Sequence, residues 1–80
     1  MTIETRIKKL LAEQIGEHPD NISNTHELLA HLGFDSLDIV EIMMAMEQEF
    51  AIDIDDDQFI ALKTVQQVID HVHARTGATA

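Results

Sequence analysis

Apolar side chains recur at intervals of three and four residues in three separate segments of this sequence, and that spacing restricts the fold more than any other feature. The segments run from Met1 to Gly16, from Ser36 to about Phe50, and from Thr64 to about Arg75. An α-helix turns about 100° per residue, so each segment presents one buried stripe when it is helical. The sequence therefore predicts an all-α fold.

Local signals indicate where these helices begin and end. Thr2, Asp35 and Thr64 each stand at or just before the start of an apolar segment. A side-chain oxygen at that place can accept a hydrogen bond from the free backbone amides of the first turn. Asp38 follows Asp35 by three residues, and a negative charge there suits the positive end of the helix dipole. Gly16 is a natural stop for the first helix. We therefore expect well-capped helices.

The connections between the helices differ in length. Residues 16–34 form a connection that is long for a compact domain. It contains five large apolar residues that we expect to pin it to the core: Ile22, Leu28, Leu29, Leu32 and Phe34. After Phe50, Asp55 is expected to cap a short third helix that extends to about Ala61. The prediction is a four-helix bundle with a long first loop and a short third helix.

Length and charge limit the classes of function. Eighty residues predict a single domain, 1–80, with a core too small to enclose an active site. The formal net charge is −10, and no Lys or Arg lies between Lys9 and Lys63, which disfavours nucleic acid and anionic membranes and favours proteins with basic patches. There is no cysteine and no apolar run of membrane-spanning length. We expect a cytoplasmic monomer.

The acidic run after the second helix resembles a calcium loop only in part. Asp53, Asp55 and Asp57 occupy the first, third and fifth positions of an EF-hand loop, but Gln58 replaces its glycine and Thr64 replaces its final glutamate. The five histidines are scattered along the chain, and we expect them to be solvated. The sequence therefore predicts no metal site.

The segment from Ser36 to Phe50 carries two apolar stripes. One stripe is the predicted core face: Ile39, Ile42, Met43, Met46 and Phe50. The other lies roughly opposite, among carboxylates, and this pattern is typical of a docking surface. A helix buried on both sides is the alternative, which the charges of Glu41 and Glu47 disfavour. The predicted partner-binding residues are Asp35, Leu37, Asp38, Val40, Glu41, Met44, Glu47 and Ile54.

A serine stands in the first turn of this segment without a structural reason. Capping explains Asp35 and Asp38 but not Ser36. No general base, oxyanion glycines or strand-turn-helix elbow accompanies Ser36 in the sequence, so a catalytic nucleophile is not expected there. We predict no catalytic residue in this chain.

The residues around Ser36 match a known family. The segment from Leu32 to Glu41, LGFDSLDIVE, followed by MEQEF at residues 46–50, closely resembles the discrete, type II acyl carrier proteins of bacteria. That family has a Leu-Gly-x-Asp-Ser-Leu signature whose serine receives 4′-phosphopantetheine. The resemblance covers nearly the whole chain, because the length, the helix placement and the serine position all agree.

The resemblance implies a carrier and not an enzyme. Ser36 would receive the arm from coenzyme A, through a phosphopantetheinyl transferase that supplies the base and the metal. Acyl groups would then be carried as thioesters to synthase enzymes of fatty-acid, polyketide or specialised-lipid assembly, and the Met-rich core could shelter an acyl chain. A peptidyl or aminoacyl carrier, or an acidic interaction protein with an unmodified serine, is the alternative.

Two residues depart from the family pattern. His31 replaces an acid that is common before the Leu-Gly pair, and Asp55 replaces a proline that is common at the start of the third helix. The first change weakens the acidic rim slightly, and the second is expected to loosen the third helix. With both departures, the chain could be the carrier of a dedicated pathway and not of the housekeeping one.

Overall fold

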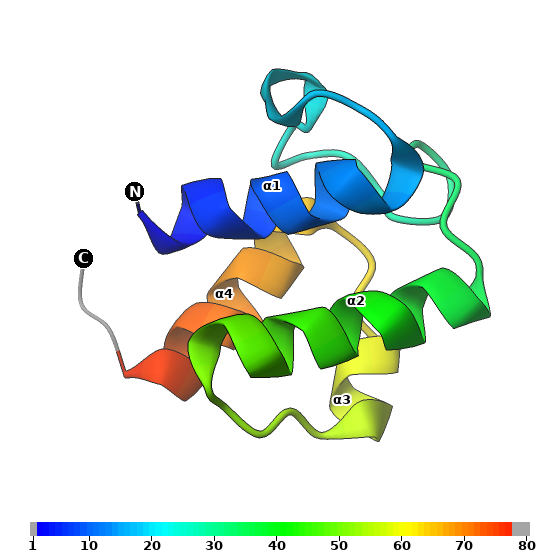
Figure 1. Ribbon diagram of the computed structural model, residues 1–80. Helices are drawn as coiled ribbons and strands as arrows, with labels where there is room; N and C mark the ends of the chain where they lie inside the picture. The colour runs from blue at the N-terminus through cyan, green and yellow to red at the C-terminus, as the bar shows by residue number, and fades with distance from the viewer. Residues whose placement is uncertain (1, 78–80) are drawn as a thin grey trace.

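The computed structural model describes residues 2–77, and these residues form a helical bundle (Figure 1). The α-helices are α1 (Ile3–Ile15), α2 (Ser36–Phe50), α3 (Asp56–Ile60) and α4 (Val65–Thr76), and a 3₁₀-helix (Pro19–Asn21) lies in the long first connection. The predicted fold class, with its long first loop and short third helix, is confirmed. None of the helices in residues 2–77 is long and apolar enough to span a bilayer.

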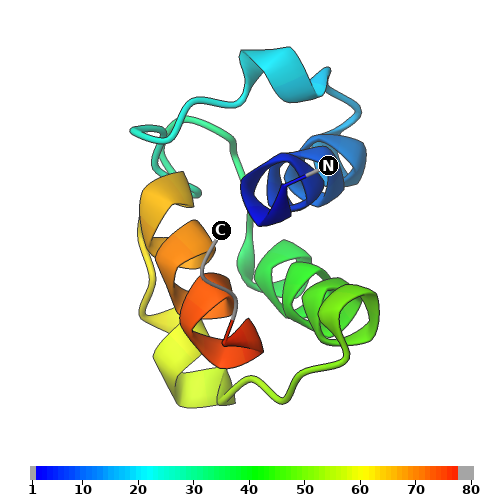
Figure 2. The same cartoon turned by 90° about the vertical axis from the view of Figure 1, so that its left-hand side faces the viewer.

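Helices α1 and α2 lie side by side and run in opposite directions. Both are seen nearly end-on in Figure 2, where α4 runs beside them. Helix α4 packs against α1, and α3 packs against α2. At the start of α1, the Arg6 guanidinium donates to the Glu49 carboxylate, 2.7 Å away, and lies 4.5 Å from the centroid of the Phe50 ring. Because both charged side chains are partly exposed, this ion pair stabilises the fold by no more than about 1 kcal/mol.

Side-chain caps begin all four α-helices, as the sequence predicts. In each cap a side-chain oxygen accepts a hydrogen bond, at 2.9–3.1 Å, from the backbone N–H of the residue three positions later in the sequence. The capping residues are Thr2, Asp35, Asp55 and Thr64. Asp55 therefore starts α3 by capping it, in the position where the family commonly has a proline. Each cap satisfies an otherwise free amide and contributes about 1 kcal/mol.

The core is largely aliphatic and is built from all four α-helices and the first connection. Its fully buried large side chains are Ile7, Leu11, Leu28, Ile42, Met46, Phe59, Val65, Val68 and Val72. Each contributes roughly 1.5–3 kcal/mol of transfer free energy. Phe59 is the largest of them and the buried residue of α3, so one ring anchors that short helix.

The long first connection is held by backbone hydrogen bonds to the start of α4. The amides of Val65 and Gln66 donate to the carbonyls of His26 and Asn24 at 3.0 and 2.9 Å, which satisfies two free amides of the helix start. Apolar side chains pin the connection less fully than the sequence predicts. Leu29, which we expected in the core, is 67% exposed.

His71 differs from the solvated histidine that the sequence predicts. Its ring meets the Phe59 ring edge-on, with centroids 6.2 Å apart, and its Nε2 atom is buried without a hydrogen bond to any part of the described chain. Burial lowers the pKa of His71, the nearby Arg75 guanidinium lowers it further, and the Asp55 carboxylate partly opposes both effects. Neutral His71 therefore suits the folded protein.

We expect His71→Gln to gain stability relative to the wild type as the pH falls. The lowered pKa means that the folded protein binds the His71 proton less tightly than the unfolded chain, whose histidines have a pKa of about 6.5. Protonation therefore destabilises the wild-type fold below that pH and has no effect well above it. The difference in Tm between variant and wild type should change by only a few degrees between pH 7.5 and 5.5, because the ring is partly exposed and solvent screens part of the effect. Thermal melts measure it, with His18→Gln as the control. An equal shift in both variants would contradict the assignment.

Candidate functional site

The chain presents Ser36 at the surface by anchoring the residues just before it. Gly33 has a φ of 73°, a left-handed conformation that few residues other than glycine adopt. Phe34 is buried, and its amide donates to the Leu28 carbonyl at 3.0 Å. Asp35 caps α2, and Ser36 follows as the first residue of the helix with an exposed side chain. The serine is thus held rigidly but left accessible.

Two carboxylates flank Ser36 in a reciprocal capping arrangement. The Asp38 amide donates to Asp35 Oδ1 at 2.9 Å, and the Asp35 amide donates to Asp38 Oδ2 at 3.1 Å. Hydrogen bonds hold the pKa of Asp38 below its usual value, first from the Gln14 side-chain amide and then from the Asp35 backbone N–H. Asp38 is therefore ionised at neutral pH.

The surroundings of Ser36 do not activate its hydroxyl. Within residues 2–77 no histidine or carboxylate accepts a hydrogen bond from it, so no general base of this chain is placed to remove its proton. Such a serine is suited to be the substrate of another enzyme. It is not suited to be a catalytic nucleophile.

Beside Ser36 lies an apolar cavity of about 160 Å³ between α2, α3 and the first connection. It is lined by Leu28, Leu29, Ser36, Ile39, Val40, Ile60 and Leu62. A larger groove of about 440 Å³ lies elsewhere, against Arg6 and Glu49, but its lining is mostly charged and suits water. The cavity at Ser36 is the one that could shelter an apolar group attached there.

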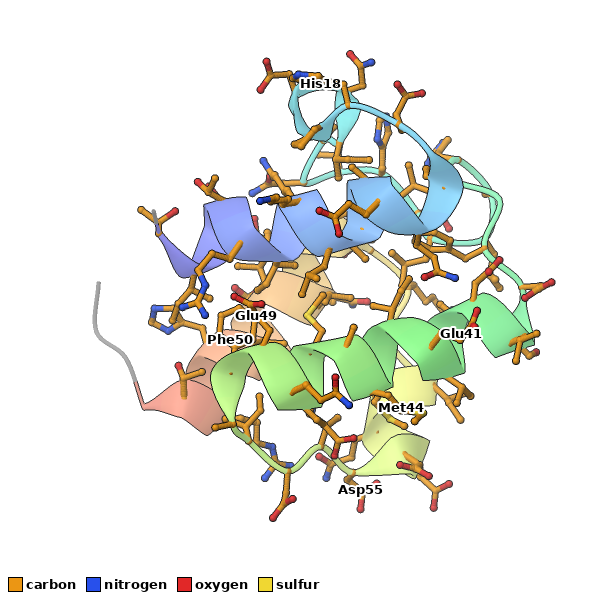
Figure 3. The ribbon with its side chains drawn as sticks, viewed as in Figure 1. His18, Glu41, Met44, Glu49, Phe50 and Asp55 are labelled. Atoms are coloured by element: carbon orange, nitrogen blue, oxygen red, sulfur yellow. The ribbon has the colours of Figure 1, made fainter. Side chains whose placement is uncertain are left out.

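Four of the predicted partner-binding residues are exposed at the surface: Asp35, Leu37, Glu41 and Met44. The side chains of Leu37 and Met44 are 66% and 53% exposed, and Glu41 between them is exposed as well. Figure 3 labels Glu41 and Met44 on successive turns of α2. Val40 is half-buried because it lines the cavity beside Ser36. The outer stripe of α2 is thus accessible, and the alternative of a helix buried on both sides is wrong.

Two residues of the predicted docking set have structural roles. Ile54 is only 6% exposed and belongs to the core, so placing it at the margin of the docking surface is a correction of the sequence-based expectation. The Glu47 carboxylate accepts from the Ile54 amide at 3.1 Å and is half-buried. It fastens the segment after α2, which leaves it less available to a partner.

Three residues near the site were not predicted from the sequence. Leu29 and Ile60, which are 67% and 58% exposed, form the rim of the cavity, although Leu29 was expected in the core. Gln14 of α1 reaches the carboxylates of α2. No sequence signal reveals Gln14, because it is a neutral residue that meets its partners only after folding.

Known proteins share both the sequence pattern and this fold. Residues 5–72 match the family described as "phosphopantetheine attachment site". The structure superposes with a TM-score of 0.85 on a protein assigned as an acyl carrier protein from Mycobacterium tuberculosis, with 27% identity over 91% of this chain and 97% of that one. A doublet acyl carrier protein from prodigiosin biosynthesis has the same fold, with a TM-score of 0.78 and 20% identity over 91% of this chain and 35% of that one.

The family match spans most of the chain, and the fold agrees with it across nearly the whole length of the mycobacterial protein. Carriers of this family hold 4′-phosphopantetheine covalently and do no chemistry themselves. They interact with a phosphopantetheinyl transferase and with acyl-processing enzymes. The protein therefore belongs to the phosphopantetheine attachment family, as a non-catalytic acyl carrier protein.

Proposed function

We propose that Ser36 is the residue that receives 4′-phosphopantetheine, and that residues 1–80 act as one carrier domain. The observation that carries this proposal is the exposure of Ser36 at the start of α2, next to an apolar cavity. Helix starts tolerate anions, so a phosphodiester fits this position. The Asp35 carboxylate is exposed to solvent, which screens its charge, and the Asp38 carboxylate accepts hydrogen bonds from Gln14 and the Asp35 amide.

The loading reaction uses Ser36 as a substrate of the transferase. The serine oxygen attacks the β-phosphate of coenzyme A, a new P–O bond forms to Ser36, and the bond to the departing adenosine 3′,5′-bisphosphate breaks. The serine proton passes to a base of the transferase. The thiol at the far end of the arm then carries acyl groups as thioesters.

We further propose that the cargo is of the fatty-acyl type, from fatty-acid biosynthesis or a related polyketide or specialised-lipid route. The cavity beside Ser36 supports this cargo because its lining is aliphatic apart from Ser36 itself. A peptidyl or aminoacyl group carries an amine or amides that are costly to bury there. We also propose that the carrier is a monomer in the cytoplasm. Coenzyme A in that compartment would supply the arm.

Loading is tested by the intact mass of the protein after incubation with coenzyme A, magnesium and a phosphopantetheinyl transferase. One added phosphopantetheine unit, recovered on the proteolytic fragment that contains Ser36, is the expected result. A protein of unchanged mass, with a known carrier loaded in parallel, would refute the proposal.

Acyl length should affect stability up to about six carbons. An apolar cavity of about 150 Å³ holds benzene, so the cavity beside Ser36 suits a similar number of carbons. Each buried CH₂ contributes up to about 0.8 kcal/mol. The Tm of the loaded protein should therefore rise from acetyl to butanoyl to hexanoyl arms and level off with longer chains. A glycyl arm, which has no apolar chain, is the control. A Tm that does not depend on chain length would show that the cavity does not hold the acyl group.

We propose that partners dock on the outer face of α2, through Leu37 and Met44 for contact and Glu41 for electrostatic attraction. Asp35 and Asp38 lie at the N-terminal end of α2, beside Leu37. Val40 and Glu47 lie at the margin of this docking face. Acidic side chains raise the rate of encounter with basic partners, whereas apolar side chains supply short-range contact. This division suits a carrier that must bind several enzymes weakly in turn.

Glu41→Lys should slow loading by the transferase roughly tenfold at low ionic strength, because it replaces an attraction with a repulsion. The loss should be much smaller at about 1 M salt, where the Debye length is about 3 Å. Steady-state kcat/KM at both salt concentrations measures the effect. Asp70→Lys on α4 makes the same change in net charge away from the docking face and is the control. An equal loss at both salt concentrations would exclude electrostatic steering by Glu41.

A further inference from the structure

Gln14, on the last turn of α1, connects that helix to the acidic start of α2. Its side-chain nitrogen donates to Asp38 Oδ1 at 3.0 Å and to Glu41 Oε1 at 2.9 Å. One amide carries two N–H donors, so a single half-buried side chain serves both carboxylates. Figure 3 shows Glu41 on the side of α2 that faces the end of α1. The first helix therefore reaches the region beside Ser36.

Without such a donor, the two carboxylates would separate. Asp38 and Glu41 are three residues apart on one helix face, where like charges repel. The Gln14 amide holds them together and is the largest single cause of the lowered pKa of Asp38. Both oxygens of Asp38 are engaged, by Gln14 and by the Asp35 amide, whereas Glu41 is exposed to solvent. One donor thus holds the two carboxylates next to each other.

The residue type at position 14 matters for this arrangement. A lysine could also bridge the two carboxylates, but its charge would cancel part of their attraction for a basic partner. Glutamine donates the same hydrogen bonds and adds no charge. The two negative charges therefore stay available at one place on the surface.

We propose that Gln14 is a positioning residue for partner recognition: it holds Asp38 and Glu41 as a preordered pair that receives a basic side chain of the phosphopantetheinyl transferase. This inference rests on the proposed function, since it concerns the loading of Ser36. A preordered pair does not have to lose side-chain freedom when the transferase binds. The contribution of Gln14 therefore belongs to binding and not to the chemical step.

The test compares Gln14→Met with the wild type in steady-state loading at low ionic strength, with the apo carrier as the varied substrate. Methionine keeps the length and helix propensity of glutamine but cannot donate. We expect KM to rise roughly five- to tenfold with kcat unchanged, because the carboxylates must be ordered on binding. The pKa of Asp38, followed by NMR, should rise in the same variant, which loss of packing alone would not cause.

Two further variants separate this role from a general effect on the fold. Gln66→Met removes a similar amide–carboxylate bond, to Asp70 on α4, and should leave KM unchanged. Gln14→Lys should keep a bridge to the two carboxylates and the wild-type circular dichroism but should not keep the low KM. A Gln14→Met protein with wild-type KM, or an equal rise in Gln66→Met, would overturn the inference while leaving the loading of Ser36 intact. A wild-type protein that is not loaded at all would refute the proposed function and this inference with it.

Discussion

Replacing Ser36 by alanine is expected to abolish loading completely and to leave the fold unchanged. The arm is joined through the serine oxygen, and alanine has none. The cap of α2 is made by Asp35 and Asp38, so it survives the substitution. Alanine is also the best helix former, and the site is exposed, so the free energy of unfolding should change by no more than about 0.5 kcal/mol.

Intact mass and far-UV circular dichroism together measure this outcome. The chain contains two serines, Ser23 and Ser36, so Ser23→Ala is a matched control that should still accept the arm. Ser23 lies in the first connection, where its hydroxyl meets that of Thr25. An arm that persists on Ser36→Ala, or that disappears from Ser23→Ala, would place the attachment elsewhere.

The helices could be predicted from the sequence because their signals are local. Thr2, Asp35 and Thr64 stand within three residues of the amides they cap, and the apolar stripes repeat inside each helix. The position of Ser36 at the start of α2 follows from Asp35 alone, since a cap fixes the register of the first turn. The candidate site could therefore be located from local sequence signals.

The errors fall where the outcome depends on contacts between distant segments. Leu29 and Ile54 are both apolar residues outside the long helices, and no periodicity indicates that one is exposed and the other buried. His71 has a polar side chain on a helix, and its contact with Phe59 arises only when α3 folds back onto α4. Gln14 meets Glu41 across 27 residues of sequence. Such pairings follow from packing and not from local pattern.

Phe59→Ala is expected to be the most destabilising substitution among the site's supporting residues. Helix α3 has five residues, far fewer than a helix needs to be stable alone, and Phe59 is its buried residue. Truncating a buried phenylalanine costs about 3–5 kcal/mol. Small domains have a total stability near the lower end of about 5–15 kcal/mol, so the loss removes most of it. The Tm should fall by roughly 15 °C or more.

Thermal unfolding of Phe59→Ala and Ile60→Ala measures this effect on adjacent residues of the same helix. Ile60 is 58% exposed, so its truncation should cost far less than that of Phe59. Ile60 nevertheless lines the cavity beside Ser36, so its variant should lose the stabilisation that a hexanoyl arm gives while keeping the apo Tm. A Tm for Phe59→Ala within about 5 °C of the wild type would mean that α3 is not anchored by this ring. The position of α3 would then depend more on the Asp55 cap and the Arg75–Gln58 hydrogen bond.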